Sequence, residues 1–307
     1  SSHFKQQHLI MIKRILKSFA IILILFVGFS FYMSPRLGGL LNFGKDSIDK
    51  TIHKLEFDTI SDAKYNLIYK DFSQREDLVI LRKEFKLDSI IADCETDFDK
   101  VVKIQSWVQS RWKHDGENIP EKNDALFILR EAEKGKRFRC VEYSIVANQC
   151  LLSLGFTVRG LGLMTKDISE VKSGGGHAVN EVFVRDLNKW VLIDPQYDVI
   201  TTFNNKPLNA VELQRCIANN WDFEILNPNQ TITKEDYKKW IGPYLYYFTT
   251  TLKGEPVDIW DRIVGNKKQL TLIPKGAKEP KYFQKIFRIN NSYYTNSIND
   301  FYPKLDD

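Results

Sequence analysis

Three residues of different chemical types, Cys140, His177 and Asp194, occur in local settings that could support nucleophilic chemistry. A cysteine attacks a carbonyl carbon as the thiolate, and a free thiol with a pKa of about 8.5 is mostly protonated at neutral pH. An imidazole can accept that proton and remain beside the sulfur as the imidazolium. A carboxylate can then hold the imidazole in one orientation. We therefore take these residues as candidate nucleophile, base and orienting group.

The setting of Cys140 favours the ionised thiol. The apolar side chains of residues 140–154 recur with helical period, so Cys140 is predicted to begin a helix. The unpaired N–H groups and the macrodipole of a helix start favour negative charge. The basic residues Lys136, Arg137 and Arg139 lie just upstream and are expected to act in the same direction.

His177 and Asp194 are predicted to meet across a β-hairpin. His177 follows three consecutive glycines, which allow the backbone to approach closely. Residues 177–184 and 190–194 alternate as strands do, with a turn at 185–189. Asp194 then falls almost opposite His177. Since cross-strand neighbours on one face have Cβ atoms about 5 Å apart, the carboxylate can orient the imidazole.

The elements around these residues predict an α+β fold, because helices come first and antiparallel strands follow. Asp97 is the predicted N-cap of a helix with a core-facing apolar stripe. The tail beyond residue 241 is rich in Tyr, Phe and Thr and is predicted to form a small, mainly β appendage. Helices are expected near 78–85, 97–108, 125–132, 140–154 and 209–217, and strands at 156–164, 177–184 and 190–194.

The N-terminal segment resembles a membrane anchor. A basic flank precedes an almost unbroken apolar run at residues 18–33, which is typical of a signal or signal anchor. A buried core helix is disfavoured because the run has no polar face. The cleavage site offered near Ser30 is mediocre, so we expect an uncleaved anchor. The remainder of the chain is then extracytoplasmic, in the periplasm or at the cell surface, and secreted if cleavage does occur.

Composition limits the class of partner. The net charge of +5 is spread along the chain, and neither a long basic run nor a zinc-finger spacing occurs, so no nucleic-acid partner is expected. Four cysteines without a C-x-x-C pair do not predict a disulfide scaffold or a zinc site. A Cys94–Cys216 disulfide is compatible with an extracytoplasmic location, but two buried thiols are the favoured interpretation. We expect no metal and no cofactor.

Three sequence blocks, 138–143 (FRCVEY), 176–183 (GHAVNEVF) and 190–195 (WVLIDP), resemble the signature blocks of the transglutaminase-like superfamily. They occur in the family's order and at similar separations, and the resemblance covers roughly residues 75–219. It implies a papain-like α+β core with Cys140, His177 and Asp194 as the catalytic triad.

The segment 107–116 also resembles the helix that precedes the nucleophile in bacterial members. There Trp112 would line the cleft or help to stabilise an oxyanion, although a core position is the simpler interpretation. The chain departs from the common pattern after the aspartate, with Gln196 where threonine is frequent, and after the histidine, with Val179 where tryptophan is frequent. These departures leave the triad intact and bear on the substrate cleft.

The resulting interpretation is a catalytic domain at residues 75–230 that acts on protein or peptide amide bonds through a thioester, most simply by hydrolysis. A protein-crosslinking transglutaminase and a non-catalytic, membrane-tethered binding or assembly module are the alternatives. The expected organisation is an upstream extension at 1–10, an anchor at 11–34, a connector at 35–74, the catalytic domain at 75–230 and the appendage at 231–307.

Overall fold

The computed structural model describes residues 14, 16–19, 21–24, 45–61, 65, 67–254 and 257–305. The predicted anchor at residues 11–34 lies largely outside this part of the chain. Within it, we find no helix with both the length and the apolar character needed to cross a membrane.

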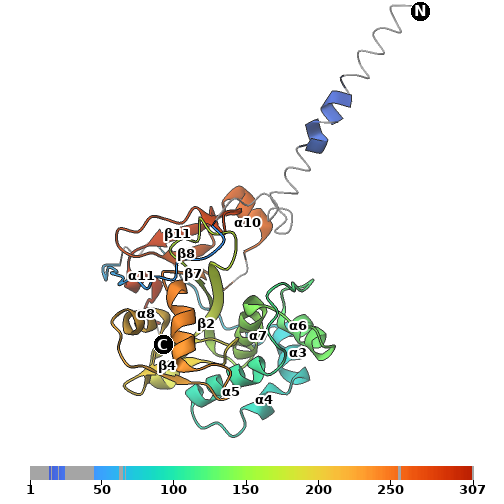
Figure 1. Ribbon diagram of the computed structural model, residues 1–307. Helices are drawn as coiled ribbons and strands as arrows, with labels where there is room; N and C mark the ends of the chain where they lie inside the picture. The colour runs from blue at the N-terminus through green and yellow to red at the C-terminus, as the bar shows by residue number, and fades with distance from the viewer. Residues whose placement is uncertain are drawn as a thin grey trace, which may run out of the picture.

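The first half of the fold is a cluster of helices around α7, as Figure 1 shows in cyan to green. Helix α7 contacts α3, α5 and α6 and packs on strands β1 and β2. Its buried side chains include Val146, Ala147 and Leu151, which recur at the helical spacing that predicted the element. The helices are α3 (Glu76–Glu84), α4 (Leu87–Ile90), α5 (Asp97–Gln109), α6 (Ala125–Glu133) and α7 (Cys140–Ser153).

The N-cap prediction for α5 was wrong by one residue. Thr96 has the extended backbone of an N-cap, and its hydroxyl accepts a hydrogen bond of 3.0 Å from the backbone N–H of Asp99. Asp97 is instead the first helical residue. Its carboxylate is used by Arg185 and Lys100, at 2.9 and 3.1 Å, and so is not available to cap the helix.

A six-stranded sheet in the order β11-β8-β7-β1-β2-β3 forms the centre of the molecule. Neighbouring strands are antiparallel, except for the parallel pair β8–β11. Residues 185–188 form the turn between β2 and β3, and Asn188 adopts a left-handed conformation there. The strands are β1 (Thr157–Met164), β2 (Gly176–Val184), β3 (Lys189–Ile193), β7 (Tyr247–Thr251), β8 (Gln269–Leu272) and β11 (Ser292–Thr295).

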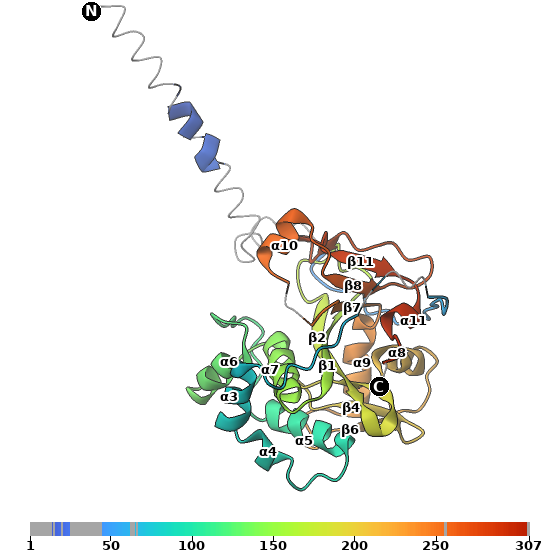
Figure 2. The ribbon, with the colours of Figure 1, turned by 180° about the vertical axis from the view of Figure 1, so that it is seen from behind.

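Helices cover both faces of this sheet, and β2 lies between α7 on one side and α8 and α9 on the other (Figures 1 and 2). Alternate residues of the strands enter two separate hydrophobic cores. Val158 and Val182 join the core with α7, whereas Leu161 and Val179 join the core with α8. The two helices on the second face are α8 (Ala210–Ala218) and α9 (Lys234–Ile241).

The C-terminal segment, predicted as a small, mainly β appendage, is instead part of the central sheet and is of mixed α and β structure. Its strands β7, β8 and β11 continue the central sheet outward from β1, and it also contains α9, α10 (Ile259–Val264) and α11 (Ile298–Phe301). Without β7, the edge of β1 would present unpaired backbone groups. Gly162 permits the pairing, because a Cβ there would lie 2.7 Å from Cγ2 of Thr249 on β7.

Two small sheets complete the fold. A three-stranded sheet follows β3, and a two-stranded one, β9–β10, lies in the C-terminal segment. Their strands are β4 (Ile200–Phe203), β5 (Lys206–Pro207), β6 (Glu224–Leu226), β9 (Tyr282–Phe283) and β10 (Phe287–Arg288).

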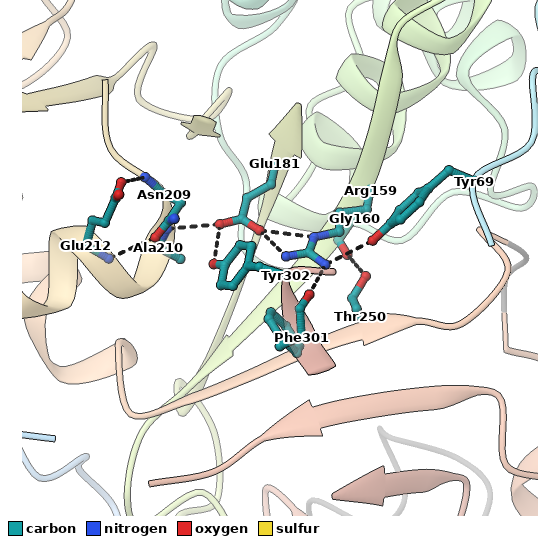
Figure 3. Close-up of polar contacts among 10 residues, drawn as sticks. All are labelled: Tyr69, Arg159, Gly160, Glu181, Asn209, Ala210, Glu212, Thr250, Phe301 and Tyr302. Carbon is teal, nitrogen blue, oxygen red and sulfur yellow. Dashed lines mark hydrogen bonds and ion pairs between the residues drawn. The ribbon is translucent and has the colours of Figure 1, made fainter. Parts of the chain in front are cut away.

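A buried ion pair joins segments that are distant in the sequence. Arg159 on β1 and Glu181 on β2 are direct partners in the sheet register, and their side chains are 2.7 Å apart with 2% and 0% exposure. Figure 3 shows that further polar groups converge on the pair from the rest of the chain. Glu181 also accepts from the Tyr302 hydroxyl and from the first N–H of α8, at 2.7 and 2.9 Å.

Arg159 makes further contacts on its side of the ion pair. It donates to the backbone oxygen of Phe301 at 2.7 Å and to the Tyr69 hydroxyl at 3.1 Å. The guanidinium carbon also lies 4.6 Å from the ring centroids of Trp190 and Phe301. The pair therefore connects the central sheet to the chain before α3 and to the C-terminal tail.

Replacing Arg159 with methionine should strongly destabilise the fold, because Glu181 would be left buried without a cation. Loss of one partner of a buried ion pair costs about 3–5 kcal/mol. The free energy of unfolding from urea denaturation measures the loss. Arg130→Met is the control, since the Arg130–Glu84 side chains are 50% and 34% exposed and such pairs contribute up to about 1 kcal/mol. Equal losses in the two variants would contradict this role for the pair.

Candidate active site

Cys140 is the first residue of α7 and is partly exposed. Its backbone N–H belongs to the first turn, whose N–H groups have no partner within the helix. Glu142, which is fully buried, fixes this helix start by accepting from the backbone N–H of Arg139 at 3.0 Å and pairing with its guanidinium at 2.6 Å. The sulfur is thereby held where unpaired N–H groups and the helix dipole favour negative charge.

His177 lies near the start of β2 and contacts Asp194. Its Nε2 is 2.9 Å from Oδ2 of Asp194, and the two side chains are 2% and 0% exposed. The prediction that they lie almost opposite each other was off by two residues in register, since Asn180 pairs with Ile193. Asp194 follows the last residue of β3, so the contact is a diagonal one between neighbours on the hairpin.

The carboxylate of Asp194 is held by further donors. The backbone N–H of Gln196 donates to Oδ1, and the buried Tyr237 hydroxyl donates to Oδ2, each at 3.2 Å. Trp240 covers the imidazole, with its ring centroid 4.5 Å from that of His177 and nearly perpendicular to it. The His177–Asp194 contact is thus shielded from solvent by α9.

Sequence reasoning missed these α9 residues. Tyr237 and Trp240 of α9 and Tyr244, in the 3-10 turn that follows α9, recur at helical spacing, a signal that indicates one aromatic face. What the pattern could not give was the position of that face, which depends on α9 packing across the second face of the sheet.

Cys140 and His177 line the same cavity, and their interaction lowers the pKa of the thiol. Because Nε2 faces Asp194, the nitrogen left for the sulfur is Nδ1. Burial raises the pKa of the Cys140 thiol, but the hydrogen bond and charge of His177 and the backbone N–H of Ala178 outweigh it, so the pKa is lowered overall. The geometry therefore permits a thiolate–imidazolium pair.

The pKa of His177 moves in the opposite direction. Burial lowers it, but the charge of Asp194, the hydrogen bond to Asp194 and the interaction with Cys140 together raise the pKa to about 9. The imidazole therefore keeps its proton at neutral pH, beside a thiol whose pKa is lowered.

The basic residues upstream of Cys140 do not contribute as expected. Lys136 is paired with Glu131 and Arg139 with Glu142, so their charges are already compensated. Neither is among the groups that shift the pKa of the Cys140 thiol. The shift originates from the strand that carries His177.

Trp112 lies in the helical core and is 7% exposed. Its indole ring packs on Tyr143, with centroids 4.3 Å apart, and it does not line the cavity next to Cys140. Its Nε1 is buried and has no hydrogen-bond partner among the described residues. The ring position agrees with the simpler core interpretation, and the oxyanion role stays a prediction.

Cys140 and His177 line a cavity of about 220 Å³. Strand β1 and the segments around α10 and β9–β10 form its other walls, so the C-terminal part of the chain contributes to the site. Gly176, next to His177, allows a close approach here, because a Cβ at this position would lie 2.7 Å from the ring of Phe283 on β9. The cavity gives a substrate access to the sulfur.

The four cysteines are free thiols, so Cys94 and Cys216 form no disulfide here. Cys150 and Cys216 are buried, and Cys94 is partly exposed. Within the described part of the chain, no group of three or more His, Cys, Asp or Glu side chains is arranged to hold a metal ion.

Comparison with known proteins agrees with the resemblance noted in the sequence. Residues 86–195, which include Cys140, His177 and Asp194, match the family model described as the transglutaminase-like superfamily. This match confirms the family resemblance and supports a thiol enzyme of papain-like type at a coarse level.

Among solved structures, the chain overlaps one titled "a Putative Cysteine Protease from Cytophaga hutchinsonii". The sequence identity is 12% and the TM-score is 0.33, over 58% of this chain and 62% of that chain. The overlap thus spans less than two thirds of that protein, and at this TM-score it does not bear on function. Comparison with curated proteins found no match.

Iodoacetamide should alkylate Cys140 at a lower pH than Cys94. The pKa of Cys140 is lowered by His177, whereas burial and the charge of Asp93 raise the pKa of Cys94. The pH dependence of both rates can be read in one sample by peptide mass spectrometry, with Cys94 as internal reference. His177→Ala removes the hydrogen bond and the charge that lower the Cys140 pKa most, while burial and the charge of Asp194 still raise it, so the Cys140 rate at neutral pH should fall about tenfold or more. Equal rates for Cys140 in the two proteins would contradict the ion pair.

Proposed function

We propose that this chain, whose residues 86–195 belong to the transglutaminase-like superfamily, is a thiol enzyme that cleaves amide bonds of proteins or peptides through Cys140, His177 and Asp194. The observation that carries the proposal is the shared imidazole. His177 is 2.9 Å from Asp194, and it shares with the Cys140 thiol the wall of a cavity large enough for part of a peptide.

In the proposed reaction, the Cys140 thiolate forms a bond to the carbonyl carbon of the substrate amide, and the carbonyl oxygen takes the negative charge. The backbone N–H of Cys140 is the first candidate to stabilise this oxyanion, because it lies at a helix start. The unpartnered Nε1 of Trp112 is the second candidate.

The tetrahedral species then breaks down as the amide C–N bond is cleaved and the His177 imidazolium transfers its proton to the leaving amine. A thioester on Cys140 remains. Neutral imidazole next removes a proton from water, the hydroxyl oxygen attacks the thioester, and the thiolate leaves. Asp194 keeps the imidazole aligned in both steps, and Tyr237 and Trp240 keep that contact dry.

We propose hydrolysis, with water as the acyl acceptor. The predicted N-terminal anchor supports an extracytoplasmic, membrane-attached location, where proteins and envelope peptides would be the substrates.

The test is turnover of a protected glutamine peptide in the presence of a labelled amine. Release of ammonia or peptide without incorporation of the amine supports hydrolysis, whereas incorporation identifies a crosslinking transglutaminase. Cys140→Ala should abolish both, and Cys94→Ala should retain activity as the matched control. Trp112→Phe in the same assay should lower kcat with KM unchanged if the indole serves the oxyanion. A Cys140 that forms no thioester with any such substrate would favour the non-catalytic module.

Turnover should decline above about pH 9, where His177 loses the proton it must transfer to the leaving amine. Asp194→Asn retains a hydrogen-bond acceptor but removes the charge that raises the pKa of His177. The alkaline limb of kcat/KM should therefore move to lower pH in this variant. A pH profile of kcat/KM for both proteins measures the shift, and an unmoved limb would assign the ionisation to another group.

A further inference from the structure

We infer that Arg262 and Arg288 form a carboxylate-binding subsite next to Cys140, so that the preferred acyl donor carries an acidic group close to the amide that is attacked. This inference rests on the proposed function and specifies its substrate class. Both arginines line the same cavity as Cys140 and His177. They come from α10 and β10, in the C-terminal segment that completes the sheet.

Apart from the Cys140 sulfur, the charged groups that line the cavity are cationic. No aspartate or glutamate is among the described residues that line it. The remaining polar groups of the wall are largely committed to one another. Asn291 donates to Gln269 at 2.9 Å, and the Thr249 and Thr271 hydroxyls are 3.1 Å apart. An anion entering this cavity would therefore meet two guanidinium groups and no repelling carboxylate.

Neither arginine of the cavity wall is neutralised by an acidic side chain of the described chain. Arg130, Arg139 and Arg159 each form an ion pair with a glutamate. Among the described residues, neither Arg262 nor Arg288 forms an ion pair. The guanidinium of Arg262 lies 6.0 Å from the ring centroid of Phe287, and partial burial lowers its pKa. Both arginines are exposed residues in the cavity wall and form no ion pair among the described residues, so a ligand anion can reach them.

The shape of the site fits the same ligand. A guanidinium presents its N–H groups in a planar fork that matches the two oxygens of a carboxylate. The apolar part of the wall can accept the carbon chain between that carboxylate and the amide, with a volume of about 220 Å³. This wall includes Leu163, Met164, Phe283, Phe287 and Ile289. The match is to a peptide with an acidic side chain or a free terminal carboxylate beside the reacting residue.

The β9–β10 sheet, which carries Arg288, contacts the segment between β1 and β2 that leads to His177. The β9–β10 sheet is fixed by the backbone N–H of Gln284, which donates to the oxygen of Ile168 at 2.9 Å. It also packs through the ring of Phe283 against Gly176, next to His177. The subsite is therefore positioned by the same strand that carries the imidazole.

The first test uses two alkylating reagents that differ in charge. Iodoacetate carries a carboxylate, whereas iodoacetamide is neutral. The ratio of their rates at Cys140 reports anion recognition, and the iodoacetamide rate alone reports activation of the thiol. Arg262→Gln and Arg288→Gln should each lower the ratio about threefold, and more together, with the iodoacetamide rate little changed. Arg215→Gln, an exposed change on α8 outside the cavity, is the matched control and should leave the ratio unchanged.

The outcomes separate the two proposals. A rapid iodoacetamide reaction with a ratio that is unaltered in the double variant overturns the subsite and leaves the proposed enzyme standing. A slow iodoacetamide reaction in the wild-type protein overturns the proposed function, and the ratio still decides whether anions are recognised. Arg288→Lys, which keeps the charge, should retain most of the ratio. A loss of the ratio as large as that in Arg288→Gln would contradict a role for charge.

The second test identifies the source of the carboxylate. Four glutamine peptides are compared: with an acidic or a neutral neighbour, each with a free or an amidated C-terminus. For each protein, the kcat/KM of the preferred acidic peptide is divided by that of the fully neutral peptide. This ratio should fall about tenfold in the double variant. A fall for the peptide with an acidic neighbour identifies a side-chain carboxylate, and a fall for the peptide with a free C-terminus identifies a terminal one. Equal kcat/KM for all four peptides in the wild-type protein would overturn the inference.

Discussion

The buried ion pair between Arg159 and Glu181 is the constraint on which the rest of the structure depends. Each charge is removed from water, so it is tolerable only while its partners are in place. Those partners belong to β1, β2, the start of α8, the segment before α3 and the C-terminal tail. The pair thus makes the central sheet, the segment before α3 and the C-terminal tail mutually dependent. Strand β2 carries both Glu181 and His177, so the same constraint fixes the strand from which the proposed base projects.

The proposed catalytic centre likewise depends on polar groups that are buried away from water and satisfied by one another. His177 and Asp194 are as deeply buried as the ion pair, and their hydrogen bond is strong because water is excluded by α9. Cys140 is different, since it must meet a substrate and is left partly exposed at a helix start. Its ionisation is supported from across the sheet by an imidazole, and the lysine and arginine that precede it are neutralised by their own glutamates. The site therefore combines a buried His177–Asp194 contact with a partly exposed Cys140.

Local patterns were sufficient for the helix that begins at Cys140 and for the hairpin that carries His177 and Asp194. The helical period after Cys140 and the alternation around His177 and Asp194 depend on neighbours in the sequence, and both are confirmed as a helix and a hairpin. What local patterns could not supply was long-range pairing. Nothing in residues 247–251 by themselves indicates that they join the edge of β1, and nothing in α9 indicates that its aromatic face covers His177. These features arise from tertiary packing, as does the compensation of the basic residues before Cys140.

The contact between Gly176 and Phe283 has a consequence for how the chain can be divided. The space beside the proposed base is occupied by a ring from a strand more than a hundred positions downstream, and the missing Cβ is what admits it. A shortened protein that ended with the family-matched region would lack the Phe283 ring and strand β7, which pairs with β1. It would also lack one wall of the cavity next to Cys140. The shortest chain that contains the complete cavity is therefore longer than the signature blocks suggest. A fusion partner inserted between the signature blocks and the C-terminal segment would separate two segments that share one sheet and one cavity.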